Sequence, residues 1–133
     1  MNLVDTNVIV DLLDTTSPFK DWSEQQLPAA KLRGEIVINP IIYAELAALP
    51  STLPMLDEFL SLTGIAIEPL SRQCSRLAGQ AFWVYRQRKG AKTGVPPDFF
   101  IGAQAQAEGW TLLTRDVARY RTYFPDVTLI SPV

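Results

Sequence analysis

Four acidic residues stand where predicted β-strands give way to helices: Asp5, Glu45, Asp98 and Asp116. The carboxyl ends of parallel strands meet at one edge of an open α/β sheet, and ligands bind in the crevice there. Several carboxylates share a small space only with a cation or with shared protons. The chain has no His and a single Cys, so the available ligands are oxygen atoms, which suit Mg²⁺, or Mn²⁺ in its place, rather than Zn²⁺. The sequence therefore predicts that these acids bind a metal ion and serve catalysis.

Each acid also has a structural interpretation when it is considered alone. The three Asp lie at or near helix N-termini, where Asp side chains cap free amide groups, and Glu45 fits an exposed helical position. A single shared site explains all four positions at once, whereas capping has to be invoked separately at each junction. Asn7 and Thr114 add neutral polar groups at the same edge, where they would orient a carboxylate or a metal-bound water, or make local turn hydrogen bonds.

The positions of these residues depend on an alternation of short apolar strands with helices. We expect strands over residues 2–5, 35–39, 65–68, 111–114 and 128–130. Helices are expected over residues 6–13, 17–33, 52–62, 71–88, 97–108 and 117–123, with one more from Pro40 until Pro50 stops it. Pro28 should kink or split the second helix. The alternation predicts an α/β fold, a three-layer α/β/α sandwich around a mainly parallel sheet, in a single domain over residues 1–133.

The composition is that of an ordinary globular protein, with 47% hydrophobic and 20% charged residues. No apolar run reaches the roughly 20 residues of a membrane span, and the first residues lack the basic segment of a signal peptide. We therefore expect a cytoplasmic protein with no membrane association. Cys74 follows the helical spacing of its apolar neighbours, so we expect it in the core rather than as a nucleophile.

The formal net charge of −2 conceals two basic runs, one over residues 86–92 and one over residues 115–121. Removing the four proposed ligands from that charge leaves +2. Both runs flank a proposed ligand, so we expect them to contact the phosphate backbone of a nucleic acid, although solvated helix faces have the same composition. The candidate nucleic-acid-binding residues are Arg86, Arg88, Lys89, Lys92 and Arg115.

Four sequence motifs together resemble the PIN-domain ribonucleases, in particular the VapC-like toxins of type II toxin–antitoxin systems. They are Asp5-Thr-Asn, Asn39-Pro-Ile-Ile-Tyr-Ala-Glu45, Pro97-Asp98-Phe-Phe-Ile-Gly-Ala-Gln-Ala and Leu112-Leu-Thr-Arg-Asp116. The motifs occur in the family's order, and the resemblance spans essentially the whole chain. It implies that Asp5, Glu45, Asp98 and Asp116 form the family's acidic quartet, with Asp5 and Asp98 as direct Mg²⁺ ligands. It also implies a PIN-like fold, a homodimer, and an antitoxin partner whose C-terminal segment enters the site.

The expected function is that of a toxin that hydrolyses RNA. Without His, the chain lacks the two-histidine chemistry that uses the RNA 2′-hydroxyl as nucleophile, whereas a metal held by carboxylates activates a water to attack the phosphate. Hydrolysis of that kind leaves a 5′-phosphate and a 3′-hydroxyl. A phosphate-loop NTPase is excluded because its motif G-x-x-x-x-G-K-S/T is absent, and Asn7 stands where an aspartyl phosphatase needs a second Asp. The alternative that stays open is a catalytically silent RNA-binding or protein-interaction module of the same fold.

Overall fold

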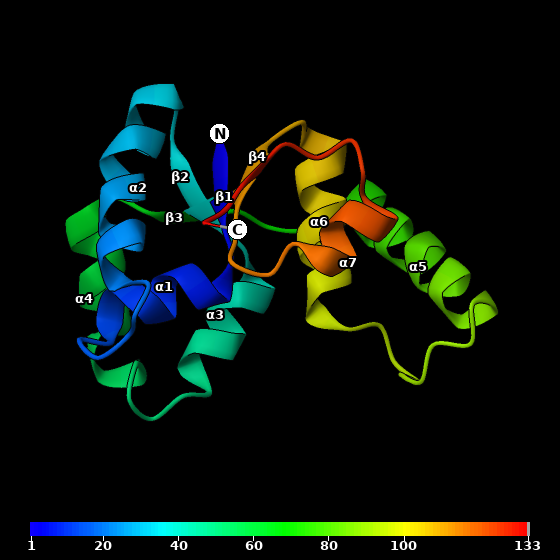
Figure 1. Ribbon diagram of the computed structural model, residues 1–133, viewed down its shortest axis with the longest axis horizontal. Helices are drawn as coiled ribbons and strands as arrows, with labels where there is room; N and C mark the ends of the chain where they lie inside the picture. Colours follow the sequence, from blue (N-terminus) through cyan, green and yellow to red (C-terminus); the bar gives the residue numbers. More distant parts are fainter. Residues whose placement is uncertain (133) are drawn as a thin grey trace.

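The central sheet is built from five short parallel strands (Figure 1). They are β1 (Asn2–Val4), β2 (Ile36–Ile38), β3 (Ala66–Ile67), β4 (Thr111–Leu113) and β5 (Leu129–Ile130). Their order is β3-β2-β1-β4-β5, so β1 lies in the middle and pairs with β2 on one side and β4 on the other. The computed structural model describes residues 1–132, and the last residue of the predicted domain, Val133, lies outside the described residues.

Helices cover both faces of this sheet. They are α1 (Thr6–Leu13), α2 (Lys20–Arg33), α3 (Pro40–Ala47), α4 (Leu53–Thr63), α5 (Arg72–Gln87), α6 (Pro97–Glu108) and α7 (Ala118–Tyr123). In Figure 1, α1, α2 and α4 lie on one side of the strands, and α5, α6 and α7 lie on the other. Helix α3 contacts both groups, with α1 and α4 on one side and α6 on the other. The predicted three-layer α/β/α fold is confirmed, and all five strands of the sheet are parallel.

Local sequence signals account for most helix ends. The side chains of Asp5, Asn39 and Ser71 accept hydrogen bonds from the first amides of α1, α3 and α5, which is the function of an N-cap. Gly64 and Gly109 end α4 and α6 in the left-handed conformation, with φ of 71° and 69°. Each of these residues was placed near a helix end by the sequence, so the chain direction into and out of the sheet follows from local chemistry.

Several predicted boundaries differ from those observed. The strands are one or two residues shorter than expected, and two of the residues at the predicted strand ends, Asp5 and Asn39, are the N-caps of α1 and α3. Helix α2 begins at Lys20 rather than at Ser17, whose hydroxyl donates to Asp11. The helix also runs unbroken through Pro28, so the alternative of a split helix is wrong.

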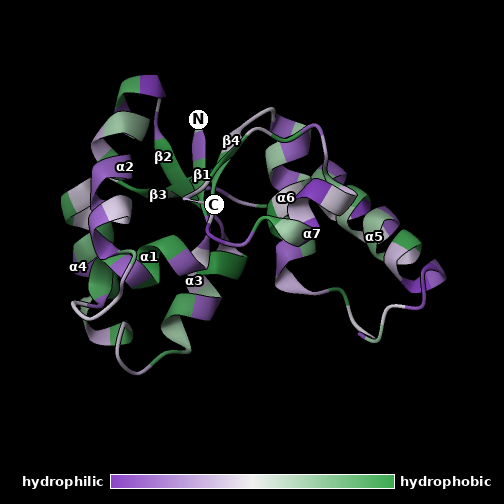
Figure 2. Cartoon of the chain, in the orientation of Figure 1, coloured by the Kyte–Doolittle hydropathy of each residue, from purple (hydrophilic) through white to green (hydrophobic). Residues whose placement is uncertain are grey.

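The core lies between the sheet and its helices. The inner strands β1, β2 and β4 are almost entirely buried, and Figure 2 shows β2 and β4 as mainly hydrophobic, whereas β1 begins with the hydrophilic Asn2. Cys74 is buried in α5, as predicted. Within residues 1–132 no helix has both the length and the apolar character needed to cross a membrane. Because β1, β2 and β4 are buried in this core, the loops that follow these three strands are held at one edge of the sheet.

Candidate functional site

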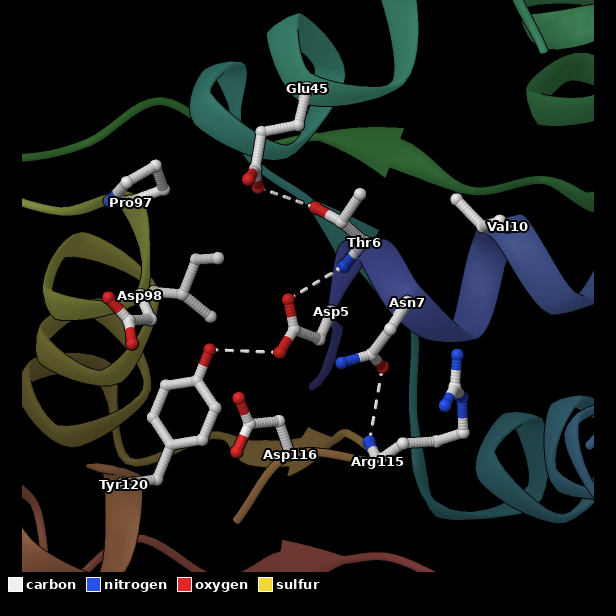
Figure 3. A pocket seen from close by; sticks show the side chains of 11 residues that line it. Asp5, Thr6, Asn7, Val10, Glu45, Pro97, Asp98, Arg115, Asp116 and Tyr120 are labelled. Atoms are coloured by element: carbon white, nitrogen blue, oxygen red, sulfur yellow. Dashed lines mark hydrogen bonds between the residues drawn. The ribbon is translucent and has the colours of Figure 1, made fainter. Parts of the chain in front are cut away.

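A pocket of about 460 Å³ opens at the carboxyl ends of the central strands. This is the switch point of the sheet. The chain runs from β1 outward to β2 and β3, and then returns to β4 on the opposite side of β1. All four predicted acids line it, namely Asp5, Glu45, Asp98 and Asp116. Figure 3 shows Asp5 in the middle, with the other three carboxylates around it. We call this cavity the acidic pocket.

Asp5 is the most buried of the four acids, with 6% of its surface exposed. Its Oδ1 accepts a 2.7 Å hydrogen bond from the Thr6 amide, and its Oδ2 accepts hydrogen bonds from the hydroxyls of Thr114 (2.8 Å) and Tyr120 (2.9 Å). Burial raises the pKa of Asp5 above its usual value, the three hydrogen bonds oppose that rise, and the charge of Glu45 adds to it. Asp5 is thus both the cap of α1 and a carboxylate fixed in one orientation.

Glu45 approaches Asp5 from a different helix. It lies in α3, and its Oε1 accepts a 2.6 Å hydrogen bond from the hydroxyl of Thr6. Thr6 therefore donates to both carboxylates, through its amide to Asp5 and through its hydroxyl to Glu45. One residue in the first turn of α1 fixes the relative position of two acids.

Asp98 lies in the first turn of α6, but it does not cap that helix. The N-cap position is occupied by Pro96, and no side chain caps the helix. The Asp98 carboxylate instead pairs with Arg119 of α7, whose Nη1 lies 3.2 Å from both of its oxygens. The capping interpretation is therefore wrong for Asp98.

Asp116 lies in the loop between β4 and α7 and is exposed. Its backbone is held by Thr114, because the Asp116 amide donates a 3.1 Å hydrogen bond to the Thr114 hydroxyl oxygen. The N-cap of α7 is Val117, so Asp116 is not a cap either. Within residues 1–132 no side chain or amide donates to its carboxylate, which leaves both oxygens open to the pocket.

The two predicted supporting residues lie beside these acids. Thr114 is fully buried and contacts Asp5 and Asp116, as described above. Asn7 lines the pocket, and its Oδ1 accepts a 3.1 Å hydrogen bond from the Arg115 amide, while its Nδ2 lies 3.5 Å from the Thr114 hydroxyl. Together they connect the end of β1 to the end of β4.

The donor set of the acidic pocket fits a hard divalent cation. Across the described residues 1–132, no Lys or Arg pairs with Asp5, Glu45 or Asp116, so three of the four carboxylates have no positive partner of their own. The acids surround the pocket without forming a closed cage, since no three Asp, Glu or Cys side chains in that part of the chain converge on one point. Mg²⁺ is commonly bound by one or two carboxylates and retains several waters, which suits an open arrangement.

The predicted RNA-binding residues do not form one cluster. Arg115 lines the acidic pocket, but its Nε donates at 2.6 Å to the buried Asp11, and its guanidinium lies 4.5 Å from the ring centre of Phe19. Arg86 donates to the carbonyls of Gly90 and Lys92, which ties the loop after α5 to that helix.

The remaining three basic residues lie outside the acidic pocket. Lys89 and Lys92 are exposed, and the guanidinium of Arg88 lies 5.4 Å from the ring centre of Tyr123. RNA binding by these side chains stays a prediction.

Three residues at the site were not identified from the sequence. Tyr120 and Thr6 hold the acids, and Arg119 pairs with one of them. Thr6 follows directly on Asp5, so a hydroxyl in the first helical turn was a usable signal. Tyr120 lies 115 residues from Asp5, and nothing local indicates that pair.

Comparisons with known proteins agree with this fold. A comparison with curated proteins gave no match. Among solved structures, the chain is similar to one of VapBC2 from Rickettsia felis bound to a DNA fragment from its promoter, with 25% identity, a TM-score of 0.76, and coverage of 98% of this chain and 97% of that one. It is also similar to FitAcB from Neisseria gonorrhoeae (24% identity, TM-score 0.71, 99% and 98% coverage).

A DNA-bound VapBC from Salmonella typhimurium has the same fold at 17% identity, with a TM-score of 0.71 and coverage of 98% and 96%. Comparison with protein families matches the PIN domain over residues 3–125, which includes all four acids and the residues that hold them. Since this match covers most of the 133 residues, the chain belongs to the PIN domain family.

Proposed function

We propose that this protein is a metal-dependent endoribonuclease that acts as the toxin of a toxin–antitoxin pair. The observation that carries the proposal is the meeting of four carboxylates, from four separate segments of the chain, in one pocket at the switch point of the sheet. Capping does not explain Asp98 or Asp116, whose side chains cap neither α6 nor α7. A shared ion explains all four positions.

Asp5 and Asp98 would be the direct ligands of Mg²⁺, or of Mn²⁺ in its place, as the family resemblance implies, and Glu45 and Asp116 would line the same pocket around the ion. The ion supplies an activated water and offsets negative charge on the scissile phosphate. The protein's own contribution is orientation. Tyr120, Thr114 and the Thr6 amide hold Asp5, and the Thr6 hydroxyl holds Glu45. The expected products carry a 5′-phosphate and a 3′-hydroxyl.

Cleavage of total cellular RNA tests this proposal. We expect cleavage with Mg²⁺ and none in EDTA, and Asp5→Asn or Asp116→Asn should lower the rate by more than about a hundredfold. Asp21→Asn is the matched control, because it removes the same charge from α2, away from the pocket. Folded protein that leaves RNA intact with Mg²⁺ would favour the alternative, a catalytically silent RNA-binding or protein-interaction module.

The proposed partners are an antitoxin and a second copy of the chain. The antitoxin is the partner that the resemblance to VapC-like toxins implies, and the likeness to the VapBC2 structure spans nearly the whole chain. A surface for the second copy is offered by α4 and the turn before it, where Leu49, Leu53 and Met55 are exposed to 38%, 51% and 43%. Leu56 is buried and belongs to the core.

Light scattering of the purified protein tests the homodimer, and Leu53→Lys should make it monomeric. Co-expression with the product of a neighbouring reading frame tests the antitoxin. We expect the proposed site of action to be the cytoplasm, where cellular RNA is available.

A further inference from the structure

A second pocket adjoins the acidic pocket along Asp98 and Asp116. It has a volume of about 410 Å³ and is lined by Asp98, Asp116, Ala118, Arg119, Thr122 and Tyr123. We call it the flanking pocket. Its volume falls within the roughly 300–1,000 Å³ of typical ligand sites. Because two acids line both pockets, a molecule that reaches the acids from one pocket can extend into the other.

Arg119 is held at the boundary between the two pockets. Its Nη1 lies 3.2 Å from both oxygens of Asp98, and its guanidinium lies 5.2 Å from the ring centres of Tyr85 and Phe99. The contacts with Asp98 use one of its nitrogens, and an arginine side chain has five N–H donors in a fixed plane. Its remaining donors are available to a second anion, and the two rings restrict where that anion can lie.

Tyr123 forms the aromatic wall of the flanking pocket. The centre of its ring lies 5.3 Å from that of Phe99 and 6.1 Å from that of Tyr85. The Arg88 guanidinium lies 5.4 Å from the centre of the Tyr123 ring. The ring is partly exposed, so one part of it is supported by the core while another faces the pocket. Aromatic rings interleaved with arginines are the usual means by which proteins bind single-stranded nucleic acid, since bases stack on the rings and phosphates pair with the arginines.

We propose that the flanking pocket binds the nucleotide next to the scissile phosphate, with Arg119 contacting a phosphate and Tyr123 contacting the base. This inference rests on the proposed nuclease function. RNA is a polymer, so a phosphodiester held at Asp98 and Asp116 carries a nucleotide on either side, and the flanking pocket borders those two acids. The acids alone would repel that nucleotide, and Arg119 is the cation of the described chain that pairs with one of them.

Binding can be measured separately from cleavage in an Asp5→Asn background. The probe is a fluorescein-labelled single-stranded RNA of eight nucleotides, measured by anisotropy in EDTA at several salt concentrations. Arg119→Gln should weaken binding about tenfold and reduce the salt slope by about one unit. Tyr123→Leu should weaken it about tenfold as well, because it removes the stacking surface, while Tyr123→Phe should retain the affinity.

Matched controls separate a pocket contact from a general charge or folding effect. Arg121→Gln removes the same charge from an exposed position of α7 that does not line the pocket, and Trp83→Leu removes an exposed aromatic ring from α5. Both should bind the probe as the parent does. Thermal melts establish which variants are folded, and Tyr123→Phe keeps the aromatic wall testable if Tyr123→Leu unfolds.

The outcomes distinguish this inference from the proposed function. If the parent protein cleaves RNA while Arg119→Gln and Arg121→Gln bind the probe equally well, the flanking pocket is not a nucleotide site and the nuclease proposal stands. If no RNA is cleaved but Arg119→Gln alone loses affinity, the pocket binds a nucleotide and the nuclease proposal fails. In the active enzyme, Arg119→Gln should raise KM more than it lowers kcat, as loss of a substrate contact does.

Discussion

The hydroxyl of Tyr120 donates a 2.9 Å hydrogen bond to Oδ2 of Asp5, across 115 residues of sequence. Tyr120 is 2% exposed. Burial, together with the nearby Asp5 carboxylate, raises the pKa of Tyr120 well above its usual value, so the phenol stays protonated and remains a donor throughout the working pH range. The bond joins α7, near one end of the chain, to the carboxylate that follows the central strand.

Replacing this donor should weaken the acidic pocket without removing any acid. Tyr120→Phe is expected to lower the cleavage rate about ten- to a hundredfold and to raise the Mg²⁺ concentration needed for half-maximal rate, because partners of metal ligands set ligand orientation. The measurement is a Mg²⁺ titration of cleavage. Tyr43→Phe is the matched control, since its hydroxyl donates to the exposed Asp57, outside the pocket. Equal losses in the two variants would contradict the role given to Tyr120.

The raised pKa of Asp5 makes a prediction about stability without metal. Because burial raises the folded-state pKa above the unfolded value, the ionised carboxylate destabilises the fold, and this penalty is absent at low pH and grows as pH rises past the unfolded value of about 4. Asp5→Asn should therefore melt at a higher temperature than the parent near pH 7 in EDTA. The difference should shrink toward pH 4. Thermal melts of the two proteins across this range provide the measurement, and a lower melting temperature for Asp5→Asn at pH 7 would contradict it.

Thr6 offers a way to disturb Glu45 while leaving its charge in place. Thr6→Val keeps the shape of the side chain and the amide that donates to Asp5, but removes the 2.6 Å hydrogen bond to Glu45. We expect a loss of about three- to tenfold in cleavage rate, smaller than for removal of an acid, because Glu45 can still reach the pocket. Thr63→Val, in which the lost hydroxyl donates to the Phe59 carbonyl of its own helix and lines neither the acidic pocket nor the flanking pocket, is the control. Single-turnover cleavage rates would show the difference.

Arg115 is predicted to matter for stability through a buried charge. The Asp11 side chain that it contacts is 2% exposed, and the hydroxyls of Ser17 and Ser23 also donate to it. Arg115→Ala should lower the free energy of unfolding by about 3 kcal/mol, because it leaves that carboxylate without its counter-charge. The measurement is urea denaturation.

A double-mutant cycle provides the check on this ion pair. If Arg115 and Asp11 are coupled, Asp11→Asn combined with Arg115→Ala should cost less than the sum of the two single changes. Additive losses would mean that the two side chains stabilise the fold independently. The exposed Arg121→Ala, which has no partner among the ion pairs of residues 1–132, should change stability by less than about 0.5 kcal/mol.

The fold and the four acids were accessible from sequence because their signals are local. Short apolar runs alternate with helical patterns, and each acid follows the end of a strand or opens a helix within a few residues. Parallel pairing then brings strand ends to one edge whatever the details of the connections. What local patterns left open was whether Asp98 and Asp116 are caps. In the structure the N-cap positions of α6 and α7 are occupied by Pro96 and Val117. Asp98 instead pairs with Arg119, which lies 21 residues away in the sequence.

The partners of the acids were less accessible for the same physical reason. A buried tyrosine hydroxyl looks like any other core aromatic until the fold places a carboxylate beside it. The basic run over residues 86–92 shows that the partners of charged side chains are equally hard to predict from sequence. Arg86 was assigned to RNA from its charge, while the structure uses one of its nitrogens to bind two carbonyls of its own loop. The number of charged residues can be read from a sequence, but the hydrogen-bond partners of each charged side chain are known only from the folded structure.

The middle position of β1 has a consequence for synthesis. Strand β1 pairs with two neighbours, residues 36–38 and residues 111–113, and both are synthesised after it. Asp5 receives its last hydrogen bond from residue 120. The segment from residue 2 to residue 120 therefore has to be made before the pocket exists, since contacts so distant in sequence form only after the segment between them has been made. A fragment that stops before β4 would carry three of the acids, Asp5, Glu45 and Asp98, but would lack Asp116 and the pairing of β1 with β4, so the acidic pocket would not form in it.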